Sequence, residues 1–141
     1  MSIVLGYDES PGARRALTTA IELASGFDET LVLVYGVAPP GSVGEEHRSY
    51  LDALTEMGRT ATDHAVAQAE EAGVRTVVEL IADKPAQAII AAADKHDARV
   101  IVVGTFGESP LRGAMLGSTP HKLLHLSSRP VLCVPARHHE I

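Results

Sequence analysis

Residues 99–107 read RVIVVGTFG, and after nine further residues the chain continues with GST at 117–119. The apolar run at 99–103 predicts a buried strand. Pro120, directly after the second glycine segment, predicts a helix start, because proline fits the first turn of a helix. Glycines between a buried strand and a helix N-terminus let the backbone approach a ligand and direct free N–H groups toward an anion. The pattern therefore predicts a phosphate site, with a nucleotide as the source of the phosphate.

Strand-like and helix-like segments alternate along the whole chain. Apolar runs at 3–7, 31–37, 76–81 and 130–134 predict four further strands. Helical patterns begin at Ser10-Pro11, near residue 46, at Pro85 and at 119–120, and Gly26 and Gly73 are expected to end the first two. The alternation predicts an α/β fold in three layers: a parallel five-stranded sheet with right-handed crossovers and helices on both faces.

Several residues that could hold a ligand follow the predicted strands. Asp8, Gly36, Asp83 and residues 104–107 all lie at strand carboxyl ends, where parallel α/β sheets bind their ligands. Asp8 is expected to hydrogen-bond ribose hydroxyls or to hold Mg²⁺ through water, and an Asx turn into the next helix is the alternative. Main-chain groups at Gly36 are expected to meet an adenine edge, unless this glycine simply ends its strand.

The glycine segment leaves two side-chain roles open. Ser118 or Thr119 is expected to cap the following helix, to donate a hydroxyl to phosphate, or to do both, since Pro120 removes one backbone donor there. Arg112 either reaches a γ-phosphate or is solvated. The segment is neither a Walker A loop nor a GxGxxG fingerprint.

Composition narrows the class of protein. The 141 residues suit one domain, expected at 1–137 with a tail at 138–141, and the scarcity of aromatic residues (4%) leaves a core of Val, Ile, Leu and Ala. The net charge of −6, with both signs interspersed, argues against duplex nucleic acid or an anionic membrane as the main partner. We expect a cytoplasmic protein, because neither a signal peptide nor a membrane-spanning run is visible.

Other kinds of site find little support in the sequence. His121 and His125 have the spacing of two metal ligands, but no third ligand is evident, so no metal site is expected. The lone Cys133 lies in an apolar run, excludes an intrachain disulfide and is expected to be an inert core thiol. No G-x-S-x-G elbow supports Ser/His/Asp catalysis, and no catalytic residue is assigned.

The glycine pattern and three other segments resemble the universal stress protein family, in its nucleotide-binding branch. That branch carries G-x2-G-x9-G-S/T, which Gly104, Gly107, Gly117 and Ser118 match. The strand leading to Asp8, the segment KPAQAI at 84–89 and the closing strand RPVLCVP at 129–135 are also similar to the family. The resemblance covers nearly the whole chain.

This resemblance implies a Rossmann-like sheet in the order 3-2-1-4-5 and a homodimer that pairs through the last strand, at Val131, Leu132, Cys133 and Val134. It also implies ATP, with or without Mg²⁺, as the ligand. Asp8 would lie near the ribose, Gly36 near adenine, and the glycine segment along the ribose and phosphates. The residues expected to bind the cofactor are Tyr7, Asp8, Gly36, Val37, Gly104, Thr105, Gly107, Arg112, Gly117, Ser118 and Thr119. Glu108 and Pro120 depart from the family pattern.

Four functions remain open on this basis. The leading interpretation is an ATP-binding, nucleotide-responsive regulator in stress response. The first alternative is a slow ATPase or self-phosphorylating protein that uses Mg-ATP, with Asp8 on the metal. A phosphoacceptor domain of the receiver type is a further alternative, although no lysine follows the last strand. The last is an interaction module without a ligand, against which the intact glycine pattern argues.

Overall fold

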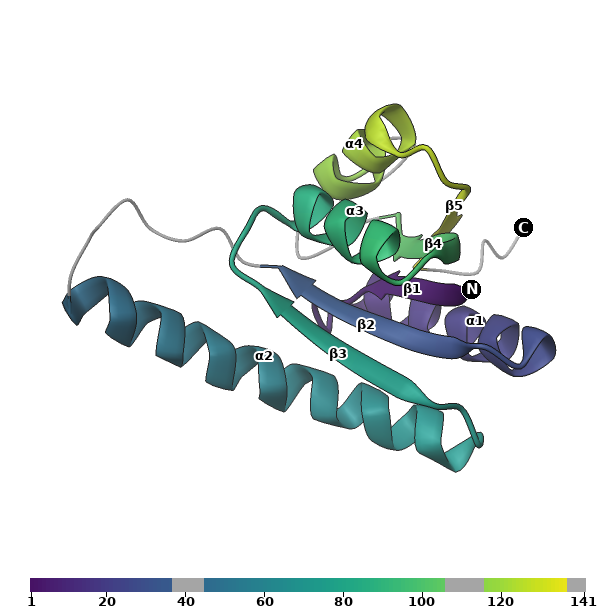
Figure 1. Ribbon diagram of the computed structural model, residues 1–141, viewed down its shortest axis with the longest axis horizontal. Coiled ribbons are helices and arrows are strands. Elements are labelled where there is room, and N and C mark those ends of the chain that lie inside the picture. The colour runs from purple at the N-terminus through teal and green to yellow at the C-terminus, as the bar shows by residue number, and fades with distance from the viewer. Residues whose placement is uncertain (37–44, 106–115, 137–141) are drawn as a thin grey trace.

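The computed structural model describes residues 1–36, 45–105 and 116–136, in which five strands and four helices alternate (Figure 1). The strands form one parallel sheet in the order β3-β2-β1-β4-β5. The elements are β1 (Ser2–Gly6), α1 (Pro11–Phe27), β2 (Thr30–Gly36), α2 (Glu45–Glu71), β3 (Thr76–Ile81), α3 (Pro85–Lys95), β4 (Ala98–Gly104), α4 (Ser118–Leu126) and β5 (Val131–Val134). The predicted fold class and strand order are confirmed.

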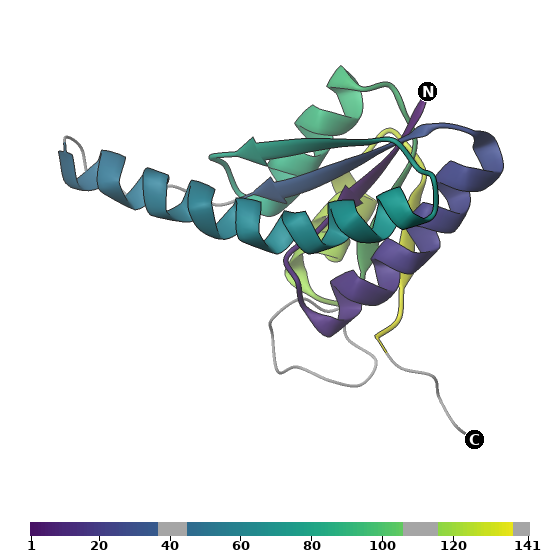
Figure 2. The same cartoon turned by 90° about the horizontal axis from the view of Figure 1, so that it is seen from below.

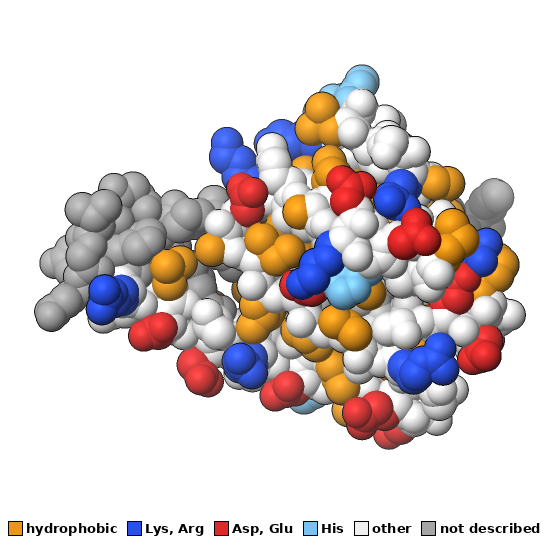
Figure 3. Space-filling view, in the orientation of Figure 1, with side chains coloured by type: hydrophobic (Ala, Val, Ile, Leu, Met, Phe, Trp, Pro, Cys, Tyr) orange, Lys and Arg blue, Asp and Glu red, His pale blue; other side chains and the backbone are white. Residues whose placement is uncertain are grey.

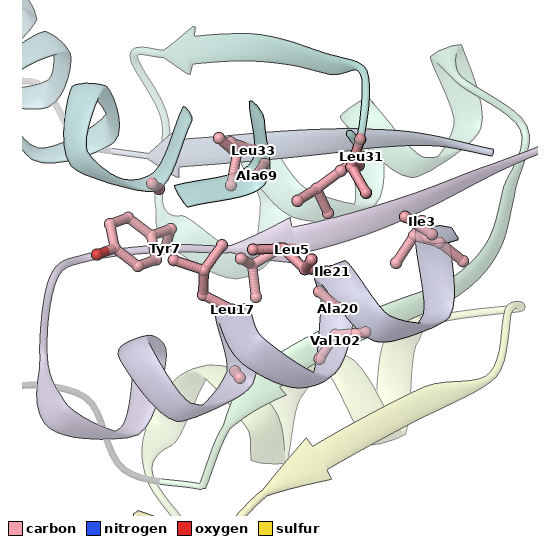
Figure 4. Close-up of a cluster of buried hydrophobic side chains, with 14 of the residues drawn as sticks. Ile3, Leu5, Tyr7, Leu17, Ala20, Ile21, Leu31, Leu33, Ala69 and Val102 are labelled. Carbon is pink, nitrogen blue, oxygen red and sulfur yellow. The ribbon is translucent and has the colours of Figure 1, made fainter. Parts of the chain in front are cut away.

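Helices α1 and α2 cover one face of the sheet, and α3 and α4 cover the other (Figure 1). Under α1 lies a cluster of buried aliphatic side chains together with Tyr7 (Figure 4). Alternate residues of the same strands, such as Val4 and Val32, point to the opposite face and pack under α3. A strand that is apolar on both faces needs a helix on each, which explains the continuous apolar runs of β1 and β2.

Helix α1 begins as the sequence indicates but ends later. The buried Ser10 caps it, with its Oγ accepting from the Ala13 N–H at 3.2 Å, and Pro11 follows in the first turn. The prediction that Gly26 ends the helix is wrong, because the helix continues to Phe27 and Asp28 takes the left-handed conformation at φ 53°. An aspartate tolerates that conformation better than most residues, so it replaces the expected glycine. Gly73 does follow α2 in the left-handed region, at φ 74°.

The backbones of α1 and β4 come into contact at two glycines, Gly12 and Gly104. A Cβ placed on Gly104 would lie 2.6 Å from the carbonyl carbon of Gly12 and 2.8 Å from its oxygen. Gly36 stands in a similar place at the end of β2, where a Cβ would lie 2.8 Å from the Cβ of Ala88 on α3. Small residues at these strand ends therefore let helices approach the sheet closely from both faces.

The long helix α2 projects beyond the edge of the sheet at its N-terminal end (Figures 1 and 2). Its second half supplies Ala61, Ala65 and Ala69 to the interior. On the face that Figure 3 shows, acidic and basic side chains are interspersed rather than collected in a patch of one sign. None of the helices in the described ranges is long and apolar enough to cross a membrane.

An ion pair ties the start of β2 to the start of β4. Arg99 Nε donates to Glu29 Oε1 at 2.8 Å, and the guanidinium lies over the ring of Phe27, with Cζ 4.2 Å from the centroid. The hydrogen bond from Arg99 is the main reason why the pKa of Glu29 is lowered. Only about a tenth of the Glu29 side chain is exposed, so the pair links the two strands in a partly desolvated position.

The close contact between Gly104 and Gly12 gives a first test of how α1 packs against β4. We expect Gly104→Ala to lower the free energy of unfolding by about 1–3 kcal/mol, because the added methyl group meets backbone atoms that cannot rotate away. Gly26→Ala is the matched control, since a Cβ there meets nothing within 4 Å and alanine favours the helix by up to about 1 kcal/mol. Urea unfolding measures both, and equal stability of the two variants would contradict this account of Gly104.

The ion pair predicts a dependence of stability on pH. Because the pKa of folded Glu29 lies below its ordinary value of 4.5, the carboxylate stabilises the fold above that value and loses this effect as the pH falls through the folded pKa. Glu29→Gln should therefore be less stable than the wild type at pH 7, and the gap should narrow in acid. Urea titrations at a series of pH values test this, with the exposed Glu22→Gln as the matched control. A gap that stays constant down to pH 2 would refute the assignment.

Candidate functional site

A cavity of about 250 Å³ opens at the carboxyl edge of the sheet, among the ends of β1, β2 and β4. Here the strand order reverses, because β1 lies between β2, which follows it in the chain, and β4, which comes much later. Such a reversal leaves a crevice between the two neighbouring connections. The starts of α1, α3 and α4 close the sides of this cavity.

Asp8 and Ser10 form the turn between β1 and α1 on one side of the cavity. Asp8 Oδ1 accepts a hydrogen bond from the Ser10 N–H at 3.0 Å, which is the Asx turn that the sequence left open. Between them, Glu9 has φ 63°, an unusual conformation for a residue other than glycine. The turn uses one carboxylate oxygen of the exposed Asp8, and the second oxygen can still accept a hydrogen bond from a ligand.

Tyr7 joins this turn to the core. Its N–H donates to the Val34 carbonyl at 2.9 Å, so the peptide continues the pairing of β1 with β2. Its ring lies in the cluster under α1, and the hydroxyl oxygen points out of the cluster (Figure 4). Burial, and then the negative charge of Glu9, raise the pKa of Tyr7, while the nearby Arg14 opposes the rise. The tyrosine therefore stays neutral at physiological pH.

Gly117 and the first turn of α4 form another part of the cavity wall. The Gly117 N–H donates to the Thr105 carbonyl at 2.7 Å, and the Thr105 N–H donates to the Val134 carbonyl at 3.0 Å. The backbone of Thr105 thus fixes α4 to the ends of β4 and β5. The expectation that Ser118 or Thr119 caps the helix is wrong, because Gly117 occupies the cap position and no side chain bonds to the first turn. Both hydroxyl groups are consequently not used for capping.

The first N–H groups of α4 lie at the cavity with no acceptor inside the helix. The first four N–H groups of any helix lack such a partner, and together they carry a partial positive charge. Pro120 removes one of these donors, which leaves those of Ser118 and Thr119 at the cavity wall. Among the described residues that line the cavity, Asp8 carries the only formal charge. The site thus pairs one carboxylate with a set of backbone donors.

Most of the predicted site residues within the described ranges meet in this one cavity. Those on its lining are Tyr7, Asp8, Gly36, Gly104, Gly117, Ser118 and Thr119. Thr105 is adjacent but not on the lining, and Asp83, expected at the same rim, instead accepts from the Lys84 N–H at 2.7 Å. Val37, Gly107 and Arg112 lie outside the described residues.

Sequence reasoning missed the apolar floor of the cavity and part of its wall. Val34, Ile89 and Val103 line it as core residues of β2, α3 and β4, and Tyr35 and Pro85 add to the side near Gly36. The carboxyl ends of the predicted strands could have indicated Tyr35 and Val103, since each directly precedes a strand-end glycine and so borders the same edge. Nothing in the local sequence singles out Ile89.

Two other groups of side chains that the sequence singled out lie outside this cavity. The rings of His121 and His125 stack edge to face with centroids 4.6 Å apart, and no group of three or more metal-ligating side chains occurs in the parts of the chain that the structure describes. Cys133 is half-buried on β5, and burial raises the pKa of its thiol, which favours the unreactive protonated form.

The model of the universal stress protein family matches residues 1–135. The chain belongs to this family. A universal stress protein of Thermus aquaticus is 33% identical to it, with 94% of this chain and 97% of the relative covered, and one of Methanocaldococcus jannaschii is 31% identical, covering 94% and 80%. In three dimensions it superimposes on the Archaeoglobus fulgidus universal stress protein solved in complex with dAMP. That comparison has a TM-score of 0.74 at 23% identity and covers 95% of this chain and 97% of the other.

As a universal stress protein, the chain carries the family's glycine pattern in two structural parts. Gly104 ends β4 and contacts α1, and Gly117 caps α4 at the cavity wall. Both glycines line the cavity, and the first of the two also meets the backbone of α1, at Gly12.

Proposed function

We propose that this universal stress protein binds an adenine nucleotide in the cavity at the carboxyl edge of its sheet, and that the nucleotide acts as a conformational ligand in a stress-response regulator. The proposal rests on one observation: Asp8, the strand-end glycines and the first turn of α4 surround the same cavity. It is supported by the dAMP complex of the Archaeoglobus fulgidus universal stress protein.

The residues divide into three roles in this proposal. Asp8 accepts from ribose hydroxyls through the oxygen that the Ser10 turn leaves free, beside the Tyr7 peptide. The main chain at Gly36 and Val37 meets the adenine edge. The phosphates lie against the N–H groups of Ser118 and Thr119, with Gly117 giving room for close approach and the remaining glycine segment, including Gly107 and Arg112, alongside.

The arrangement of charge favours binding over catalysis in this proposal. Backbone donors and a helix N-terminus stabilise a phosphate without chemistry at the phosphorus atom. The one carboxylate on the described lining, that of Asp8, accepts a hydrogen bond from the Ser10 N–H in the turn after β1. ATP with or without Mg²⁺ is the ligand that the family resemblance implies, and ADP and AMP share the groups that the cavity would contact.

Calorimetry with AMP, ADP and ATP, each with and without Mg²⁺, tests the proposal. We expect saturable binding, a loss of at least about tenfold in Gly117→Val, whose side chain enters the phosphate side, and about tenfold weaker binding in Asp8→Asn. Gly26→Ala, remote from the cavity, is the control and should bind as the wild type does. Absence of binding by all three nucleotides at millimolar concentration would refute the proposal.

We further propose that the protein forms a homodimer through β5. This strand is at an edge of the sheet, and its Leu132 is an exposed large apolar side chain, with 39% of its surface accessible. An exposed strand edge with apolar side chains favours pairing with another strand, and a second copy of the chain supplies one.

Sedimentation equilibrium tests the dimer. Leu132→Asp should shift the population toward monomer, because it places a charge in the proposed apolar contact. Met57→Asp on α2 is the matched control, since Met57 is also exposed but lies on the helix that packs beside the opposite edge strand, β3. A wild-type protein that is monomeric at high micromolar concentration, or equal effects of the two substitutions, would contradict this interface.

A further inference from the structure

A second and larger cavity, of about 530 Å³, lies on the other side of the Tyr7–Ser10 turn, between α1 and α2. The two helices converge toward their C-terminal ends and diverge toward the start of α1, as Figure 2 shows. Polar side chains from both helices line the opening.

Helical spacing brings these side chains to the same opening. Arg14 and Thr18 are one turn apart on α1, and Arg15 lies beside Arg14. On α2, His64 and Gln68 are likewise one turn apart. Residues separated by four positions lie on the same helix face, so each helix presents a short polar row to the cavity. The turn after β1 closes the end of the cavity with Tyr7 and Glu9.

Among the described residues, the lining of this cavity is rich in hydrogen-bond donors and carries a net positive charge. The described lining holds two arginines, Arg14 and Arg15, against one carboxylate, that of Glu9, and the Gln68 amide adds a neutral donor. A guanidinium presents its N–H groups in a planar fork that matches two oxygens of a carboxylate or phosphate. The buried Tyr7 adds a hydroxyl that points away from the core (Figure 4).

We propose that this cavity between α1 and α2 is a binding site for a small oxyanion, a phosphate monoester or a carboxylate, with Arg14 as the principal charged contact. The site is distinct from the cavity at the strand ends. Tyr7 is the one described residue that lines both cavities. The proposal therefore does not depend on nucleotide binding.

His64 provides a local probe of this site. We would follow the histidine Cε1–H resonances by NMR during titration with inorganic phosphate, at fixed pH and with ionic strength held constant by sodium chloride. The resonance absent from His64→Gln identifies His64. We expect the His64 resonance to shift as phosphate is added, and the change in chemical shift to level off at millimolar phosphate. A parallel titration with succinate gives the dissociation constant of a carboxylate. The anion with the lower dissociation constant, succinate or phosphate, shows which class of oxyanion the site prefers.

Three variants show whether the shift reports the proposed contacts. The phosphate dissociation constant should rise about tenfold in Arg14→Gln, which loses a charge-assisted hydrogen bond. It should fall a few-fold in Glu9→Gln, which removes the opposing charge from the lining. It should be unchanged in Arg59→Gln, a matched control on α2 that does not line this cavity.

Either of two results would overturn the inference. The first is a His64 resonance that responds to neither anion beyond the effect of sodium chloride. The second is a phosphate affinity that Arg14→Gln and Arg59→Gln leave equally unaffected, which would indicate adventitious binding only. Gly117→Val separates the two cavities, because it should remove phosphate binding at the first turn of α4 and leave phosphate binding between α1 and α2 unchanged.

Discussion

The contact between Gly104 and Gly12 is the constraint on which the carboxyl edge of this protein depends. It lets the first turn of α1 lie directly against the end of β4, with no side chain between the two backbones. The position of α1 in turn fixes Ser10, whose hydroxyl caps the helix and whose N–H holds Asp8. On the other face, Gly36 allows α3 the same close approach. The position of α1, which borders both cavities, therefore depends on glycines, which have no side chain to hold the two backbones apart.

The turn from Tyr7 to Ser10 separates two environments of opposite character. On the strand-end side, a carboxylate and backbone N–H groups line the same cavity, and the positive potential comes from the start of α4 rather than from a charged side chain of the described lining. On the α1–α2 side, the positive charge comes from arginine side chains. Backbone donors are fixed in place before a ligand arrives, whereas arginine side chains must give up rotamer freedom to bind. The two sides thus differ in preorganisation as well as in charge.

The sequence was a good guide to elements and a poorer one to their ends and to the cavity. Continuous apolar runs identified β1, β2 and β4, because burial on both faces leaves a strong local signal. The end of α1 was misjudged because Asp28 takes a left-handed conformation that sequence preference assigns to glycine first. The cap of α4 was misjudged because Gly117 is held from outside the helix, by the Thr105 carbonyl. Ile89 could not be placed at the cavity, since its position depends on how α3 crosses the sheet.

The strand order has a consequence for the growing chain. Strand β1 is made first, yet one of its two neighbours, β4, is completed only at Gly104, and the helices that cover Val4 and Val32 come after β3. During synthesis, a βαβαβ intermediate therefore emerges with one face of its sheet apolar and uncovered. Parallel pairing across such sequence distances is slow to form and leaves hydrophobic surface accessible to other chains in the meantime. The N-terminal half of this protein is accordingly the part that would depend on a chaperone at the ribosome.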